Sequence, residues 1–390
     1  MTVNEIKRYV QENLPELLEY RRHLHSYPEL SFKETETTKY IMSILDHYSV
    51  SYTVNTSGTG LVARIDGLYH GKVLAFRTDI DALPIKEETN LPYASKNEGI
   101  MHACGHDIHM TAILGLCIFL ALHKETIKGS VVFIFQHAEE VYPGGANAII
   151  QSGILKDVDA FYGFHVDPTL VTGQIACISG PAMASPTTFH CSVCGKGGHG
   201  AKPHETIDPI VIASQIICAF QSIISRKINP LDTAVISCCQ IHSGTTDNVI
   251  PDIATFSGTI RTFSDSVRDT IVQSIKNIAT QISTGMGGTC DITFEYGYPT
   301  LINPKEHAAH VIKAVKDSGY EVVSGTPTMV GEDFAYYLKY RPGAFFFLGI
   351  KNPNDTSICG LHNASLVPDE QAITVAVETC LSIYYHALDS

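Results

Sequence analysis

The chain has little positive charge. Its 390 residues include 27 Lys and Arg against 40 Asp and Glu, which gives a formal net charge of -13 and a pI near 5.7. A protein that binds nucleic-acid phosphates needs a basic surface, so this balance argues against a nucleic-acid partner. It does not bear on small anionic substrates, because a single well-placed arginine can bind a carboxylate.

The sequence also lacks the apolar segments that direct a chain to or through a membrane. Its N-terminus, Met-Thr-Val-Asn-Glu-Ile-Lys-Arg, has no apolar signal core, and we expect no uncharged apolar run of transmembrane length. The 11 cysteines are an odd number, and several lie within apolar segments, which is typical of reduced thiols rather than of a disulfide framework. These absences predict a cytoplasmic protein without a membrane partner.

The length predicts two domains, because a single core stops growing below 390 residues. Residues 1–184 and 297–390 alternate helix and strand, which predicts an α/β catalytic domain with a mostly parallel sheet flanked by helices. Residues 185–296 follow the order β-α-β-β-α-β of a ferredoxin-like domain. We expect this insert to act as a lid and a dimerisation domain, because exposed sheet edges are normally covered.

Residues 101–109, with the sequence MHACGHDIH, are the strongest chemical signal in the chain. They hold a cysteine, three histidines and an aspartate directly before the apolar run 110–122, which predicts a helix. Thiolate, imidazole and carboxylate groups are ligands for divalent transition metals. Cys104 and His106 are separated by a glycine, so both can face one ion from a tight turn.

Further residues of the ligand type follow the predicted strands. Glu139 and Glu140 come after the apolar strand 131–135, His165 follows the strand 160–164, and His362 lies in the loop beyond the strand 345–350. Open α/β sheets bind ligands at the carboxyl ends of their strands. Neighbouring side chains diverge there, so one glutamate can bind metal while the other contacts a substrate water. Their order alone does not decide which glutamate does which.

These motifs, together with Arg77-Thr78-Asp79-Ile80-Asp81-Ala82-Leu83-Pro84, resemble the amidohydrolase branch of the aminoacylase/carboxypeptidase-G metallopeptidase family. This branch includes hippurate hydrolases, N-acetyl-diaminopimelate deacetylases and plant auxin-conjugate hydrolases. The resemblance begins at Arg21-Arg22-His23-Leu24-His25, extends to the C-terminus and implies a zinc-exopeptidase-like catalytic domain. The wider family has a metal histidine where this chain has Arg77, and the resemblance implies that Cys104 replaces it. Asp79 then either orients a ligand or has little part in the site.

Carried over residue by residue, the resemblance implies two divalent ions per subunit and a general base, Glu139. The implied ligands are Cys104, His106, Glu140, His165 and His362. We expect Mn²⁺ or Zn²⁺, while Co²⁺ and Ni²⁺ also suit thiolate and imidazole donors. We expect Asp107 and His109 to support the ligands, because ligating imidazoles commonly need a partner on the other ring nitrogen.

The insert is expected to contribute contacts with the substrate. His199 lies in the glycine-rich turn 195–204, and the resemblance implies that it reaches a substrate oxygen, often in the partner subunit's site of a homodimer. The resemblance assigns Asn248 and Arg261 to the substrate's carboxylate, and a planar guanidinium suits that task. No Gly-Lys-Ser/Thr sequence follows the turn, which argues against a nucleotide site.

The sequence therefore predicts a metal-dependent amidohydrolase that cleaves N-acyl amino acids, for example N-acetyl or N-benzoyl amino acids, through a metal-activated water. A dipeptidase or carboxypeptidase with the same binuclear site is the alternative. A hydrolase with Cys104 as nucleophile beside His102 or His106 would be insensitive to chelator and sensitive to thiol alkylation. A purely structural metal site has no need of a base such as Glu139.

Overall fold

The computed structural model describes residues 3–354 and 359–388, and the chain forms two compact units. The large unit contains Met1–Ala182, Ile302–Thr326 and Asp333–Ser390, and the small unit contains Met183–Leu301 and Pro327–Glu332. The sequence places residues 183–184, 297–301 and 327–332 in the catalytic domain, but their contacts group them with the small unit. The chain passes between the units along β7 (Gly180–Met183) and β14 (Leu301–Asn303), which pair with each other.

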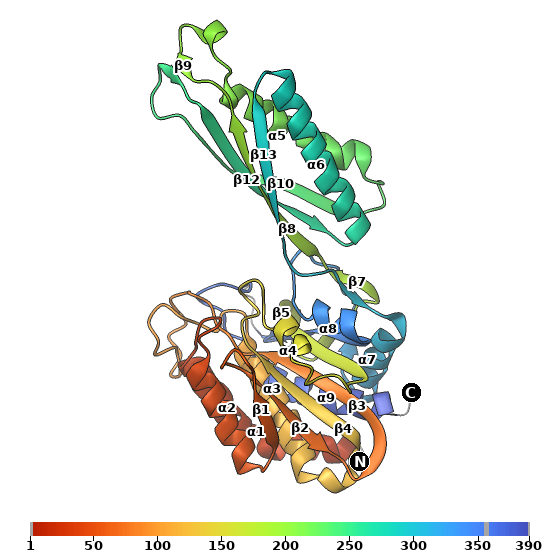
Figure 1. Ribbon diagram of the computed structural model, residues 1–390. Helices are drawn as coiled ribbons and strands as arrows, with labels where there is room; N and C mark the ends of the chain where they lie inside the picture. Colours follow the sequence, from red (N-terminus) through yellow and green to blue (C-terminus); the bar gives the residue numbers. More distant parts are fainter. Residues whose placement is uncertain (1–2, 355–358, 389–390) are drawn as a thin grey trace. The chain divides into compact units, whose positions relative to one another are not determined.

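An eight-stranded sheet forms the centre of the large unit (Figure 1), with the order β1-β2-β4-β3-β5-β16-β6-β15. Its four middle strands, β4, β3, β5 and β16, are parallel to one another. The sheet is therefore mostly parallel at its centre, and antiparallel pairs join β1 to β2, β2 to β4 and β16 to β6. The strands are β1 (Ser51–Val54), β2 (Leu61–Asp66), β3 (Tyr69–Asp79), β4 (Lys128–Gln136), β5 (Ala160–Val171), β6 (Gln174–Ala176), β15 (Glu321–Val322) and β16 (Gly343–Lys351).

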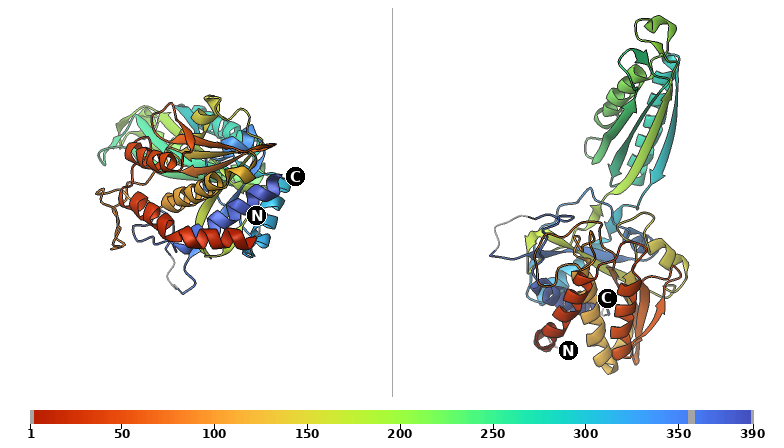
Figure 2. Two further views of the ribbon diagram at one scale, coloured as in Figure 1. Left: turned by 90° about the horizontal axis from the view of Figure 1, so that it is seen from below. Right: turned by 90° about the vertical axis from the view of Figure 1, so that its left-hand side faces the viewer.

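Helices cover both faces of this sheet. Adjacent strand residues point to opposite faces, and Tyr162 belongs to the main core while Phe161 stacks on Tyr337 of α8 at 5.1 Å. Figure 2 shows α1, α3 and α9 side by side on the core face, where they contact one another. The helices of this unit are α1 (Val3–Ser26), α2 (Thr35–His47), α3 (His106–Leu122), α4 (Ala146–Gln151), α7 (Lys305–Asp317), α8 (Ala335–Tyr340) and α9 (Gln371–Leu388).

The small unit has the β-α-β-β-α-β order that the sequence predicts, with two short strands added. Its sheet runs β10-β12-β8-β13, with every neighbouring pair antiparallel, and α5 and α6 pack on one face of it. This is the ferredoxin-like arrangement. The elements are β8 (Ser185–Cys194), β9 (Gly198–His199), α5 (Pro209–Lys227), β10 (Ala234–Ser243), β11 (Val249–Ile250), β12 (Ile253–Thr262), α6 (Asp265–Gly285) and β13 (Thr289–Tyr296).

Helix α5 is more apolar than we expected. Among the described residues, α5 is the helix that is long and apolar enough to cross a membrane, judged by length and composition alone. One side of it, with Ile212, Ile216, Phe220 and Ile223, is fully buried in the core of the small unit. Such packing is what the core helix of a folded domain shows.

Strand β5 is longer than the predicted strand 160–164. It continues to Val171, so His165 lies within the strand rather than after it. The neighbouring strand β16 extends to Lys351 and supplies partners along this length, with a register shift between Gly349 and Lys351. Pro168 falls in the stretch opposite that shift, where its missing N–H breaks no regular pair.

Candidate metal centre

A left-handed glycine sets the geometry of the first ligand pair. Gly105 has φ +79° and directly precedes α3, so Cys104 lies in the turn and His106 in the first helical turn. A Cβ on Gly105 would lie 2.6 Å from Cγ2 of Val166, closer than packed atoms allow. Only glycine fits both this φ and this contact, and Cys104 and His106 are both buried.

The two buried ligand histidines each have one nitrogen fixed by a backbone carbonyl. His106 donates from Nδ1 to the carbonyl of Asp81 at 2.9 Å, and His165 donates from Nδ1 to the carbonyl of Val166 at 2.8 Å. A carbonyl can only accept, so in the neutral form of each imidazole Nε2 carries the lone pair. Nε2 of His106 is buried and has no hydrogen-bond partner within the part of the chain that the structure describes. A backbone carbonyl on the other ring nitrogen is a typical partner of a metal-binding histidine.

Cys104 connects two groups of ligand atoms. Its Sγ lies 3.3 Å from Nε2 of His165 and 3.3 Å from Nε2 of His362. Nε2 of His362 in turn lies 3.3 Å from Oε1 of Glu140, and Nε2 of His106 lies 3.9 Å from the same oxygen. The sets Cys104–His106–His165 and Cys104–Glu140–His362 each converge within 4.8 Å. The structure thus brings all five predicted ligands together, and the donor set fits two divalent ions that share the thiolate.

His362 reaches this centre from a strained backbone conformation. Its φ is +60°, which is unfavourable for a residue with a Cβ. Its N–H donates to the carbonyl of Ala103 at 2.8 Å, which attaches the loop to the turn that carries Cys104. Strain of this kind persists only where the surroundings enforce it, and such positions are concentrated at functional sites.

The charges around Cys104 favour a bound cation. Burial, followed by the charges of Glu140 and Glu139, raises the pKa of the Cys104 thiol well above its usual value. A thiol with a raised pKa is a poor nucleophile, which argues against the cysteine hydrolase. A divalent ion would reverse this effect, because a coordinating thiol is deprotonated by the metal.

Asp79 and His109 lie beside the ligands rather than among them. Nδ1 of His109 contacts Oδ1 of Asp79 at 2.6 Å, and its Nε2 accepts the N–H of Val166 at 3.0 Å. Both nitrogens of His109 are therefore taken, which leaves none for a metal. Burial alone would raise the pKa of Asp79, but His106, His109 and Arg77 outweigh it and keep that pKa well below its usual value.

Arg77 stands where the resemblance places a metal histidine in relatives, and it is fully buried. Its guanidinium contacts Asp79 at 2.7 Å, Asp333 at 2.7 Å and Gln136 at 3.1 Å. A permanently charged guanidinium cannot ligate a metal. In this chain the guanidinium of Arg77 instead links β3 to β4 and to the segment before α8.

Glu139 approaches the centre from the end of β4. It is 7% exposed, and its carboxylate converges with His106 and Glu140 within 4.8 Å. It belongs to neither of the two groups that contain Cys104. This placement suits a base beside the ions, and the division of roles between Glu139 and Glu140 remains a prediction.

Asp107 of α3, which we expect to support the ligands, instead belongs to a buried charge network with Arg21 and His25. Asp107 Oδ2 accepts from Arg21 Nε at 3.0 Å and contacts His25 Nδ1 at 2.9 Å, while His25 Nε2 lies 3.2 Å from Glu87. Burial alone would lower the pKa of His25, but the hydrogen bonds with Asp107 and Glu87 raise it to about 9. The spacing of Arg21 and His25 places them on one helix face, a signal that could have found the pair.

The small unit holds the three remaining predicted residues, with His199 and Asn248 close together and Arg261 on another strand. Strand β9, which is labelled in Figure 1, pairs with β11, and this pairing puts His199 opposite Val249 and beside Asn248. Arg261 lies opposite Pro186, whereas Ile253, at the other end of β12, lies opposite Cys194. Eight residues of strand separate Arg261 from Ile253, which is about 26 Å at ~3.3 Å per residue. Asn248 therefore lies near the end of β12 that is remote from Arg261, and the contact of both residues with the substrate's carboxylate stays a prediction.

Each of these residues is available for a contact. Both His199 and Asn248 are exposed, and Nδ1 of His199 accepts the N–H of Ala201 at 3.1 Å. Arg261 is half-buried on the face of the sheet that α5 and α6 do not cover. Burial lowers its pKa, and no carboxylate within residues 3–354 and 359–388 forms an ion pair with it.

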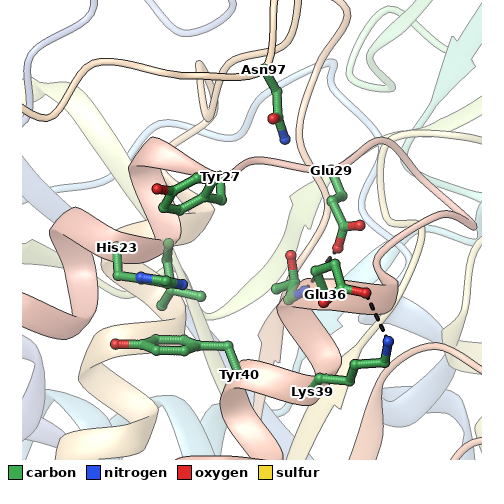
Figure 3. A pocket seen from close by; sticks show the side chains of 9 residues that line it. His23, Tyr27, Glu29, Glu36, Lys39, Tyr40 and Asn97 are labelled. Atoms are coloured by element: carbon green, nitrogen blue, oxygen red, sulfur yellow. Dashed lines mark hydrogen bonds and ion pairs between the residues drawn. The ribbon is translucent and has the colours of Figure 1, made fainter.

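A separate hollow of about 420 Å³ lies between α1 and α2 (Figure 3). Its charged groups already have partners: Lys39 contacts Glu36 at 2.8 Å, and Glu29 accepts the N–H of Thr37 at 2.8 Å. None of the residues that line it belongs to the predicted ligand set. We therefore assign the chemistry to the metal centre.

Comparison with known proteins also points to a metal-binding hydrolase. Residues 75–386 match the peptidase family M20/M25/M40. The chain is 41% identical to an N-acyl-L-amino acid amidohydrolase of Geobacillus stearothermophilus, over 82% of this chain and 87% of that protein. It is 40% identical to thermostable carboxypeptidase 1 of Saccharolobus solfataricus, over 95% of each. The crystal structure of the Bacillus subtilis YXEP protein, a dinuclear metal-binding peptidase of the M20 family, superposes with a TM-score of 0.86 at 36% identity, over 97% of this chain and 99% of that one.

Proposed function

We propose, from the premise that this chain belongs to peptidase family M20/M25/M40, that it hydrolyses the amide bond of N-acyl amino acids. The chain is a metal-dependent hydrolase by its family and its relatives. The observation that carries the finer assignment is the centre itself: two ligand groups that share Cys104, with the buried carboxylate of Glu139 outside both. The products would be a carboxylic acid and a free amino acid.

The metal ligands and the base would divide the work. Two divalent ions, Mn²⁺ or Zn²⁺ in our proposal, supply an acidified water and a polarised carbonyl when bound. Cys104, His106, Glu140, His165 and His362 would hold them. Glu139 would take the proton of the water and return it to the leaving amine, a transfer that suits a carboxylate not engaged by metal.

Substrate selection would depend on the small unit. Arg261, which has no ion pair among the described residues, would bind the α-carboxylate of the amino-acid half through both oxygens. His199 and Asn248 belong to the separate strand pair β9–β11 and its flank, which precede the Ile253 end of β12 in the chain. That end lies about 26 Å along the strand from Arg261, which exceeds the span of a small N-acyl amino acid. We propose that His199 and Asn248 serve the site of a second subunit in a homodimer.

A dipeptidase or carboxypeptidase is the second candidate, and one relative named as a carboxypeptidase supports it at 40% identity. Both reactions need the same ions and the same carboxylate contact. They differ in whether the acyl half carries a free amine. A buried carboxylate placed to pair with that amine would favour the dipeptidase.

A substrate panel tests the proposal. Metal-stripped protein is reloaded separately with Mn²⁺, Zn²⁺, Co²⁺ or Ni²⁺ and assayed with N-acetyl and N-benzoyl amino acids and with free dipeptides. We expect activity on the N-acyl compounds, loss of that activity in chelator and recovery on adding metal. Turnover of dipeptides alone would favour the second candidate, and full activity in metal-free protein would refute both.

A further inference from the structure

The segment that carries the two glutamates is held in an unfavourable conformation. Ala138, directly before Glu139, is fully buried and has φ +54°. A residue with a Cβ avoids this region of backbone space. Ala138 therefore needs contacts from outside its own strand to keep it there.

Glu34 supplies the direct contact. This residue is fully buried just before α2, and its Oε1 accepts the N–H of Ala138 at 2.8 Å and the N–H of Phe32 at 3.0 Å. Phe32 also has a left-handed backbone, with φ +64°. A single carboxylate oxygen thus fixes two left-handed residues that are 106 positions apart in the sequence.

Two further contacts join the same loop to the same segment. The ring of Phe32 packs edge-on against His137 with 5.7 Å between centroids. Oδ2 of Asp81 accepts the hydroxyl of Ser31 at 2.7 Å and the N–H of Glu140 at 3.0 Å. Residues 31–34, which we call the clamp loop, therefore contact residues 137 and 138 directly and residue 140 through Asp81, and Glu139 lies between these positions.

We propose that Glu34 is a positioning residue, which holds the backbone at Ala138 so that the carboxylate of Glu139 faces the reacting water. This inference rests on the proposed role of Glu139 as the base. Glu140 is held separately through Asp81, so loss of the Glu34 contact is expected to misplace the base without removing a metal ligand. Among the residues that the structure describes, Glu34 forms no hydrogen bond or ion pair with a metal ligand.

The test compares three variants at saturating metal. Glu34→Ala leaves the N–H groups of Ala138 and Phe32 without an acceptor and should lower kcat by roughly 10–100-fold, the scale of a small misplacement of a catalytic group. Glu34→Gln keeps an acceptor oxygen at the same reach and should retain kcat within about threefold. Both should keep KM and two ions per chain close to wild type. Adding Ala138→Gly to Glu34→Ala should recover part of the lost kcat, because glycine adopts positive φ freely.

Glu36→Gln is the matched control. Glu36 is an exposed carboxylate two residues further along, paired with Lys39 (Figure 3), and its loss should leave kcat unchanged. Equal kcat in wild type and Glu34→Ala would overturn the proposal, as would a loss confined to metal content. Should Glu34→Ala fail to fold, Glu34→Asp takes its place, because its shorter side chain cannot reach both N–H groups.

A readout without substrate separates this inference from the proposed function. Amide hydrogen exchange of a peptide covering residues 137–141 should be faster in Glu34→Ala than in wild type and unchanged in Glu34→Gln and Glu36→Gln. An inactive wild type with this exchange pattern would refute the proposed substrates and leave the clamp standing. Unchanged exchange in Glu34→Ala would refute the clamp whatever the substrate.

Discussion

Glu139 and Glu140 are adjacent residues with different surroundings. Glu140 lies 3.3 Å from His362 and belongs to a group that contains Cys104, whereas Glu139 converges with His106 and Glu140 and belongs to neither of the ligand groups that contain Cys104 among the described residues. We therefore predict that Glu139→Gln lowers kcat by about 10²–10⁴-fold, the usual contribution of a general base, and leaves two ions bound. Glu140→Gln should instead lower metal occupancy. Steady-state kinetics with elemental analysis checks this, and the reverse pattern would show that the roles are exchanged.

His25 should make the stability of the fold depend on pH. Its pKa is raised to about 9 in the folded chain, against roughly 6.5 in an unfolded one. A raised pKa stabilises the fold fully below pH 6.5, and this stabilisation is lost as the pH rises through 9. The upper limit is about 3 kcal/mol, at 1.36 kcal/mol per unit.

The measurement is the free energy of unfolding of metal-free wild type and His25→Gln from pH 6 to pH 10. The difference between the two proteins should be largest near pH 6 and should decrease towards pH 10. A difference that grows with pH would mean that His25 is neutral in the fold.

At the scale of single residues, the sequence predicts which residues form the metal site, but not which residues far away in the sequence contact them. The cluster 101–109 and the glutamate pair show their chemistry in the sequence because metal ligands belong to few residue types. The partners of Arg77 could not be found in this way, since Asp333 lies 256 positions away and an aspartate in a loop has no special signal. The clamp by Glu34 was missed for the same reason, because its acceptor role depends on the backbone of Ala138.

The turn into α3 gives a prediction at the scale of an element. Gly105→Ala would put a Cβ 2.6 Å from Cγ2 of Val166 at φ +79°. The left-handed backbone alone costs roughly 1–2 kcal/mol for such a residue, and the turn must shift to relieve the contact. We expect weaker metal binding and a lower melting temperature. Combining it with Val166→Ala should recover only part of the loss, because the backbone strain stays, and metal titration with thermal unfolding checks both variants.

Element order could be predicted better than element limits. The small unit shows the expected β-α-β-β-α-β order because hydrophobic periodicity distinguishes strands from helices. The predicted end of β5 was wrong because the strand pairing with β16 continues past Pro168. The short strands β9 and β11 have two residues each, too few for any periodicity, although they are what brings His199 to Asn248.

The outer side of α5 and the edge strand β10 bear on assembly of the whole molecule. Residues 209–225 contain no charged side chain, and Ile210 and Val211 at the start of α5 are 42% and 44% exposed. Strand β10 lies at one edge of the sheet, with Ile241 also exposed. Apolar exposure next to an open edge is typical of a surface that another chain covers. We therefore predict a homodimer through the small unit, and Val211→Lys should shift it towards monomer in sedimentation.

Complementation between two inactive variants tests whether a dimer completes the site. His199 belongs to the two-stranded sheet of β9 and β11, which precedes the Ile253 end of β12 in the chain, and Arg261 lies about 26 Å along β12 from that end. We therefore expect a single small substrate to contact both residues only if they come from different subunits. His199→Ala and Glu139→Gln should each be nearly inactive with both ions bound. In a mixed dimer, the His199→Ala subunit keeps Glu139 and receives His199 from its partner, which restores one of two sites. Equal mixing with free subunit exchange gives mixed dimers in half of the population, so activity should return to about one quarter of wild type. If His199 acts within its own subunit, neither site of the mixed dimer is complete, and proven exchange would bring no recovery.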